Sequence, residues 1–92
     1  MNSLKTFDIA QYLDDKEIIA QYLTQVMQDG DMDELLEAIG HIAKAKGMSQ
    51  IAKDTGLGRE SLYKSFTPGS HPKFETVSKV LDSLGVKLQA TA

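Results

Sequence analysis

The sequence predicts an all-α fold, a small bundle of helices formed by a chain of 92 residues. Apolar residues recur three and four positions apart along almost the whole chain, which is the spacing of one helical face. Acidic residues suited to cap a helix precede two of these stretches, and a glycine follows each of them. The length fits one domain, since domains run to roughly 50 to 250 residues, and it excludes a multidomain enzyme.

The first long helix is expected within residues 14–29. Its apolar face consists of residues three and four apart: Ile18, Ile19, Tyr22, Leu23, Val26 and Met27. Asp14 and Glu17 resemble a capping box at its start, and Gly30 is suited to end it because glycine tolerates the left-handed conformation. A shorter helical turn is expected over residues 8–13. We assign residues 1–30 to an acidic amino-terminal helical extension.

A second long helix is predicted from Asp31, which repeats the capping signature with Glu34, to Gly47. Its apolar residues are Leu35, Leu36, Ile39, Ile42 and Ala43. Two short helices follow over residues 48–55 and 58–66, separated by a tight connection at Gly56 and Leu57. Isolated helices shorter than about 12 residues are marginal in water, so both must be held in place by their neighbours.

The last predicted helix begins at Pro72, because proline suits the first helical position, and ends at Gly85. Its expected core face consists of Phe74, Val77, Val80, Leu81 and Leu84. Residues 67–71 have the composition of a loop. Apolar and polar residues then alternate over residues 86–89, which favours a short strand or a tail over residues 86–92.

The most informative stretch is residues 48–66. Two short helices that cross at a steep angle need a small residue at the crossing, a residue free to adopt positive φ in the turn, and apolar side chains in the joint. Ala52 and Gly56 meet the first two needs, and Ile51, Leu57 and Leu62 meet the third. The order of these residues predicts a helix-turn-helix, and we assign residues 31–85 to a DNA-binding domain of that kind.

The amino-terminal residues of the second helix of such a unit reach base edges in the major groove. This rule nominates Arg59, Glu60, Ser61, Tyr63 and Lys64 as base contacts, while Leu62 and Phe66 turn inward. The planar Arg59 guanidinium can pair with guanine O6 and N7. The expected phosphate contacts are Ser49, Gln50, Lys53, Ser70, His71 and Lys73, and Lys44 and Lys46 are expected to extend the same footprint on the DNA backbone. For Tyr63 the alternative is that its ring only packs at the edge of the domain.

Charge is divided unevenly along this acidic chain, whose net charge is −3. Residues 1–40 carry nine acids and two lysines, a net charge of −7, whereas residues 41–79 carry seven basic residues and three acids, a net charge of +4. Such asymmetry lets a polyanion-binding face exist on a protein that is acidic overall. The alternative is that both halves simply carry solvated charge.

Four segments together are similar to those of HigA-related addiction-module antitoxins: Lys46–Ala52, Arg59–Lys64, Phe74–Val77 and Leu84–Leu88. Residues 56–66 resemble the turn and recognition helix of Cro and phage-repressor domains, so the resemblance implies a lambda-repressor-like bundle. It also implies neutralisation of a RelE/HigB-like toxin and repression of the shared promoter. Two residues depart from the pattern: Met48 stands where the wider class often has glutamine, and Gly58 stands where family members tend to have a serine cap.

We expect a homodimer, because one domain of this size buries too little surface to bind a single DNA site tightly, and two copies would read palindromic half-sites. The expected dimer contacts are Leu4, Phe7, Ile9, Val86 and Leu88. Two other functions stay open. One is a prophage-type repressor without a toxin partner, and the other is a pure protein-interaction module that binds through residues 8–29.

Several classes are disfavoured by composition. The chain has no cysteine, and its longest apolar run is three residues, so we expect a cytoplasmic protein without a membrane span or disulfides. His41 and His71 have no second histidine at metal-binding spacing, so neither a metal nor another cofactor is expected. No Ser/His/Asp set, phosphate-binding glycine loop or HExxH motif is present, which argues against an enzyme.

Overall fold

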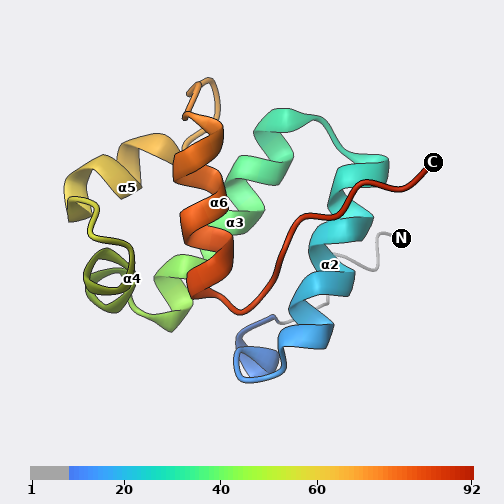
Figure 1. The fold of residues 1–92 in the computed structure, drawn as a ribbon, viewed down its shortest axis with the longest axis horizontal. Helices are drawn as coiled ribbons and strands as arrows, with labels where there is room; N and C mark the ends of the chain where they lie inside the picture. The colour runs from blue at the N-terminus through green and yellow to red at the C-terminus, as the bar shows by residue number, and fades with distance from the viewer. Residues whose placement is uncertain (1–8) are drawn as a thin grey trace.

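A computed structural model describes residues 9–92, which form one 3-10 helix and five α-helices. The elements are η1 (Ile9–Tyr12), α2 (Lys16–Asp29), α3 (Met32–Lys46), α4 (Met48–Thr55), α5 (Arg59–Ser65) and α6 (Phe74–Ser83). In Figure 1, α3 and α6 occupy the middle of the molecule, with α2 on one side and α4 and α5 on the other. The all-α prediction is confirmed for this part of the chain.

The start of α2 differs by one residue from the prediction. The helix is capped by Asp15, whose carboxylate accepts the backbone N–H groups of Glu17 and Ile18, each at 3.1 Å. Asp14 lies in the turn that leaves η1, so only Asp15 has the extended backbone that an N-cap requires. At the other end, Gly30 is extended (φ −107°) and not left-handed as expected.

The start of α3 confirms the predicted capping box. Asp31 Oδ1 accepts the Glu34 N–H at 2.9 Å, and Glu34 Oε1 accepts the Asp31 N–H at 3.1 Å. The helix ends at Gly47, whose φ of 113° favours glycine. Capping of this kind pairs the N–H groups that lack partners at the beginning of any helix.

One apolar core connects the helices. Leu36, Ile39 and Ile42 of α3 are almost completely buried, and the other α-helices contribute side chains packed around them. These are Ile19, Leu23 and Val26 from α2, Met48 and Ile51 from α4, Leu62 from α5, and Val80 and Leu81 from α6. The acidic helix α2 therefore shares its core with the helices that follow it.

Gly40, in the middle of α3, lies close to Phe66 at the end of α5. A Cβ atom built on Gly40 would lie 3.0 Å from the carbonyl oxygen of Phe66 and 3.1 Å from its Cβ. Both contacts are tighter than ordinary van der Waals separation, so this glycine lets Phe66 pack directly against the α3 backbone. The helical pattern of the sequence gives no sign of this requirement.

The start of α6 also differs from the prediction. Pro72 precedes the helix, and the N-cap is Lys73, whose extended backbone (φ −65°, ψ 149°) follows the loop. Phe74, expected in the core, is 72% exposed, while Val80, Leu81 and Leu84 of the same predicted face are buried. Because α6 begins two residues later, Phe74 is its first residue and its side chain is not enclosed by the other helices.

The carboxy-terminal tail, residues 86–92, is not a strand. Backbone pairing is what defines a strand, and the described chain offers the tail no neighbouring strand. Val86 is nevertheless buried, and its N–H donates to the Leu81 carbonyl at 3.0 Å. The apolar Val86 beside the polar Lys87 therefore marks a single residue, Val86, that packs onto the core, and not a strand with alternating faces.

Two of the predicted dimer contacts can be placed within a single chain. Val86 is buried, and Ile9 is half-buried against the core, so both already have intramolecular neighbours. Leu88 is 42% exposed. Leu4 and Phe7 lie outside the described residues. Among the described residues, no helix is both long and apolar enough to cross a membrane.

Replacing Gly40 with alanine tests the close contact with Phe66. Helix propensity alone favours alanine by about 1 kcal/mol. We expect the reverse, a loss of about 1 to 2 kcal/mol in the free energy of unfolding, because the added methyl group overpacks against the Phe66 backbone. Urea unfolding followed by circular dichroism measures the change. A more stable Gly40→Ala protein would contradict the close contact.

Candidate nucleic-acid interface

The helices α4 and α5 are held together by a turn that depends on Thr55. Gly56 adopts the left-handed conformation (φ 75°) and donates its N–H to the Ala52 carbonyl at 2.9 Å. The Thr55 hydroxyl donates to the Ile51 carbonyl at 2.8 Å and accepts the Leu57 N–H at 3.2 Å. The side chain of Thr55 thus continues the hydrogen bonding where the backbone of α4 stops.

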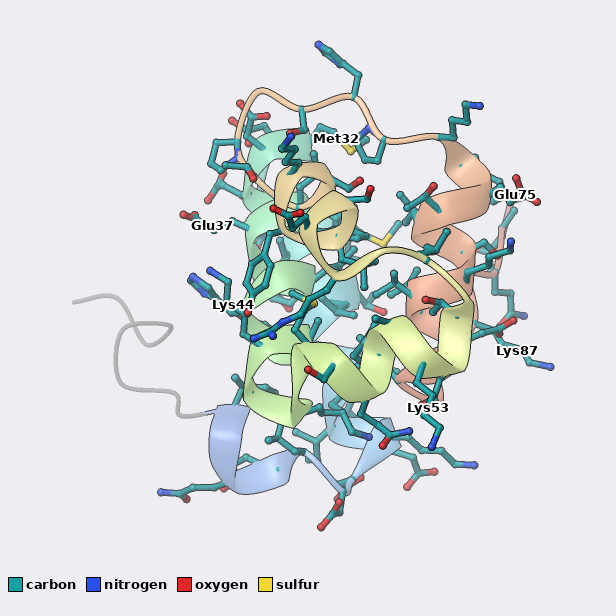
Figure 2. The ribbon with its side chains drawn as sticks, turned by 90° about the vertical axis from the view of Figure 1, so that its left-hand side faces the viewer. Met32, Glu37, Lys44, Lys53, Glu75 and Lys87 are labelled. Carbon is teal, nitrogen blue, oxygen red and sulfur yellow. The ribbon has the colours of Figure 1, made fainter. Side chains whose placement is uncertain are left out.

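Apolar residues from both helices meet on the inner side of the pair. Ile51 and Leu62 are each 1% exposed, Phe66 is buried, and Ala52 and Leu57 are half-buried against the same core. These are the residues for which the sequence predicted inward positions. Figures 1 and 2 agree that α5 crosses α4 at a steep angle, since each view looks nearly along the axis of one helix and across the other.

The outer side of α5 consists of polar side chains. All five residues nominated for base contacts are exposed: Arg59, Glu60, Ser61, Tyr63 and Lys64. The cap residue Gly58 has no side chain with which to bond the first turn, so the start of α5 is open to solvent. The geometry therefore leaves the amino-terminal turn of α5 accessible to a ligand.

Tyr63 connects this helix to α3. Lys44 Nζ lies 5.5 Å from the centroid of the Tyr63 ring, and Arg59 Cζ lies 5.9 Å from it. Both separations are within the range of cation–π attraction, which is worth about 0.5 to 1 kcal/mol at exposed sites. Tyr63 is 39% exposed, so its ring contacts both cations at the surface of the domain.

The first turn of α4 presents backbone donors beside polar side chains. Gly47, its N-cap, provides no side-chain hydrogen bond, so no side chain pairs with the first N–H groups of α4. Ser49, Gln50 and Lys53 are exposed along this helix, and the Gln50 amide donates to Asp54 at 2.8 Å. Met48 is buried in the core and cannot replace the glutamine of the wider class as a phosphate contact.

The remaining nominated residues lie elsewhere. Ser70, His71 and Lys73 follow the carboxyl end of α5, at the opposite end from Arg59. The Ser70 hydroxyl donates to the Lys64 carbonyl, so it closes the loop after α5. Gly69 N–H in the same loop donates to Asp33 at 2.9 Å. The structure therefore separates these three residues from the first turns of α4 and α5.

The basic side chains near α4 and α5 form no ion pair with an acid within residues 9–92. The described residues contain one ion pair, between Lys79 and Glu75 of α6 at 3.8 Å. Lys44 and Lys53, both expected to extend the phosphate contacts, lie on the side of the molecule that carries α4 and α5 (Figure 2). The position of Lys44 over Tyr63 depends on the packing of α3 beside α5, which residue spacing does not reveal.

No group of three or more histidine, aspartate or glutamate side chains gathers in a metal-binding arrangement among the described residues. What the site offers is a polar, cationic surface on two short helices of a small all-helical protein. Such a surface is suited to an anionic partner, through direct hydrogen bonds from arginine and lysine and through free backbone N–H groups.

The chain belongs to the family of probable addiction module antidote proteins, because the model of that family matches residues 3–92. It is also 43% identical over 86 residues to an uncharacterized protein of Haemophilus influenzae (strain ATCC 51907 / DSM 11121 / KW20 / Rd), a match that covers 94% of this chain and 89% of that protein. No solved structure matches the chain. The family supports an antitoxin role and implies a toxin partner.

Replacing Thr55 with valine tests the turn. Valine has nearly the same shape but leaves the Leu57 N–H without its acceptor, so we expect a loss of about 1 to 3 kcal/mol in the free energy of unfolding. Thr67→Val is the matched control, because the exposed Thr67 hydroxyl only donates to carbonyls of α5. Equal effects of the two substitutions in urea unfolding would contradict the role given to Thr55.

Proposed function

We propose that the protein is the antitoxin of a type II toxin-antitoxin module, related to the HigA antitoxins, and that it binds operator DNA. In this proposal it acts in the cytoplasm as a homodimer, represses its own promoter and neutralises a RelE/HigB-like toxin. The observation that carries the DNA-binding part is the exposed first turn of α5 on a helix pair held by buried apolar residues, with an arginine that forms no ion pair with any other described residue.

In this proposal α4 and α5 form a lambda-repressor-like helix-turn-helix, and α5 is the recognition helix. Arg59, at the first position of α5, would pair with a guanine edge, and Glu60 would accept from cytosine. Ser61 would reach a neighbouring base. Lys64, one turn further along, would lie closer to the DNA backbone.

Tyr63, which the sequence nominated as a base contact, is proposed here mainly to position two neighbouring cations. Both Lys44 and Arg59 lie over its ring, so we propose that it orients these cations and touches DNA only at its exposed edge. Lys44 joins Ser49, Gln50 and Lys53 as a phosphate contact. Ser70, His71 and Lys73 are the weakest members of the proposed set, because they follow the far end of α5.

The family favours an antitoxin over the two alternative functions, a prophage-type repressor without a toxin and a pure protein-interaction module. DNA binding and toxin binding are compatible within one chain. The acids of α2 and α3 would repel DNA from their side of the molecule, leaving the face of α4 and α5 as the side that approaches the duplex.

Arg59→Ala tests DNA reading. We expect the substituted protein to fold normally and to bind DNA from upstream of its own gene more weakly by about 1 to 3 kcal/mol, while binding to a scrambled duplex changes less. Fluorescence anisotropy at two salt concentrations measures both. Lys79→Ala is the control for loss of one positive charge, since Lys79 lies on α6 and pairs with Glu75. Unchanged operator affinity for Arg59→Ala would remove Arg59 from the readout.

The antitoxin part is tested by expressing the protein together with the product of the gene next to its own. We expect that product to arrest growth when it is expressed alone, to be tolerated when both are expressed, and to copurify with the antitoxin. Arg59→Ala should protect as well as the unaltered protein, because it changes only the DNA face. A neighbouring product that neither arrests growth nor copurifies would favour a repressor without a toxin.

A further inference from the structure

An apolar groove of about 450 Å³ opens between α2, α6 and the tail, with α3 as its floor. Six large apolar side chains are exposed in the described part of the chain, and four of them line this groove: Met27, Met32, Phe74 and Leu88, with exposed fractions of 50%, 65%, 72% and 42%. Apolar residues exposed singly are common, but a cluster around one groove marks an interaction site.

Phe74 is the most prominent member of the cluster. A phenylalanine side chain has on the order of 150 to 250 Å² that it can bury, and most of this area is in water here. The residue stands at the first position of α6, at the rim of the groove. It is therefore shaped to enter a groove on another molecule, while its own groove stays open to receive a similar side chain.

We propose that this groove is the interface of a two-fold homodimer, in which Phe74 of each copy lies in the groove of the other. This inference rests on the proposed homodimer and adds the surface through which it forms. A two-fold interface uses the same patch on both partners, so the patch must complement itself. A groove with an exposed aromatic ring at its rim meets that requirement in shape.

The charges around the groove are also complementary to themselves. Asp29 and Asp31 flank the turn between Met27 and Met32, whereas Lys73 adjoins Phe74 and Lys87 adjoins Leu88. Glu75, on the other side of Phe74, is paired with Lys79 of the same helix. In the proposed dimer, the basic side chains at the groove of one copy would face the acids at the groove of the other. A partner surface with charge of one sign would be attracted only to the acidic or only to the basic side of the groove. A second copy carries both signs, so the mixture of charges favours a second copy as the partner.

The position of the groove agrees with two copies on one duplex. In Figure 2, α4 and α5 face the viewer, while α6 lies at the right, the side on which Glu75 and Lys87 are labelled. The groove and the candidate nucleic-acid interface therefore occupy adjacent sides of the molecule. A two-fold axis through the groove can place both α5 helices on the same side, as reading two half-sites of a palindrome requires.

The test is the oligomeric state of the full chain, measured by sedimentation equilibrium over a range of concentrations. We expect a dimer whose dissociation constant rises roughly tenfold or more in Phe74→Glu, because a buried aromatic anchor is replaced by a charge. Ala45→Glu is the matched control, since Ala45 is exposed on α3 and does not line the groove, and it should leave the dimer intact. Circular dichroism checks that both variants are folded.

The outcomes separate the two proposals. A dimer that resists Phe74→Glu as well as Ala45→Glu would overturn the groove as the interface and leave the homodimer standing. A chain that is monomeric at every concentration would overturn both. Neither result depends on the operator titration, which tests DNA binding through Arg59 on its own.

Discussion

The burial of Ile51, Leu62 and Phe66 is the interaction on which the candidate interface depends. With 8 and 7 residues, α4 and α5 are too short to be stable alone, so their backbone is ordered only while these side chains remain in the core. Phe66 reaches that core because Gly40 has no side chain in its way. The outer residues of α5 contribute little to this packing, so they can be specialised for a ligand without cost to the fold.

Most of the helical architecture could be predicted from sequence because the signals that define it are local. The capping box of Asp31 and Glu34 involves residues three apart, and the inward direction of Leu62 and Phe66 follows from their spacing of one helical turn. The features that differed from the predicted ones depend on the neighbours that each segment has in the folded chain. Phe74 is exposed because α6 begins late, and the tail is not a strand because no described strand lies beside it.

In the candidate site, too, some features follow from local residue spacing and others from contacts between distant residues. The exposed positions of the nominated α5 residues could be predicted, since the helix presents one side to the core and the other to solvent. The pairing of Lys44 with Tyr63 could not be predicted, because it joins residues 19 positions apart on two helices whose relative placement depends on the whole core. The bond from the Ser70 hydroxyl to the Lys64 carbonyl could not be predicted either, because it depends on how the loop after α5 folds back.

The acidity of residues 1–40 has a structural origin that limits what it says about partners. Asp15, Asp31 and Glu34 each accept a backbone N–H at the start of a helix, and Asp33 accepts the Gly69 N–H of the loop after α5. These acids would be retained for capping even if the chain bound nothing on that side, because removing a cap costs about 1 kcal/mol. Net charge by itself therefore does not identify a toxin-binding surface. Glu37, which caps no helix and lies beyond the first turn of α3, is the exposed acid whose substitution would separate an electrostatic role from helix stability.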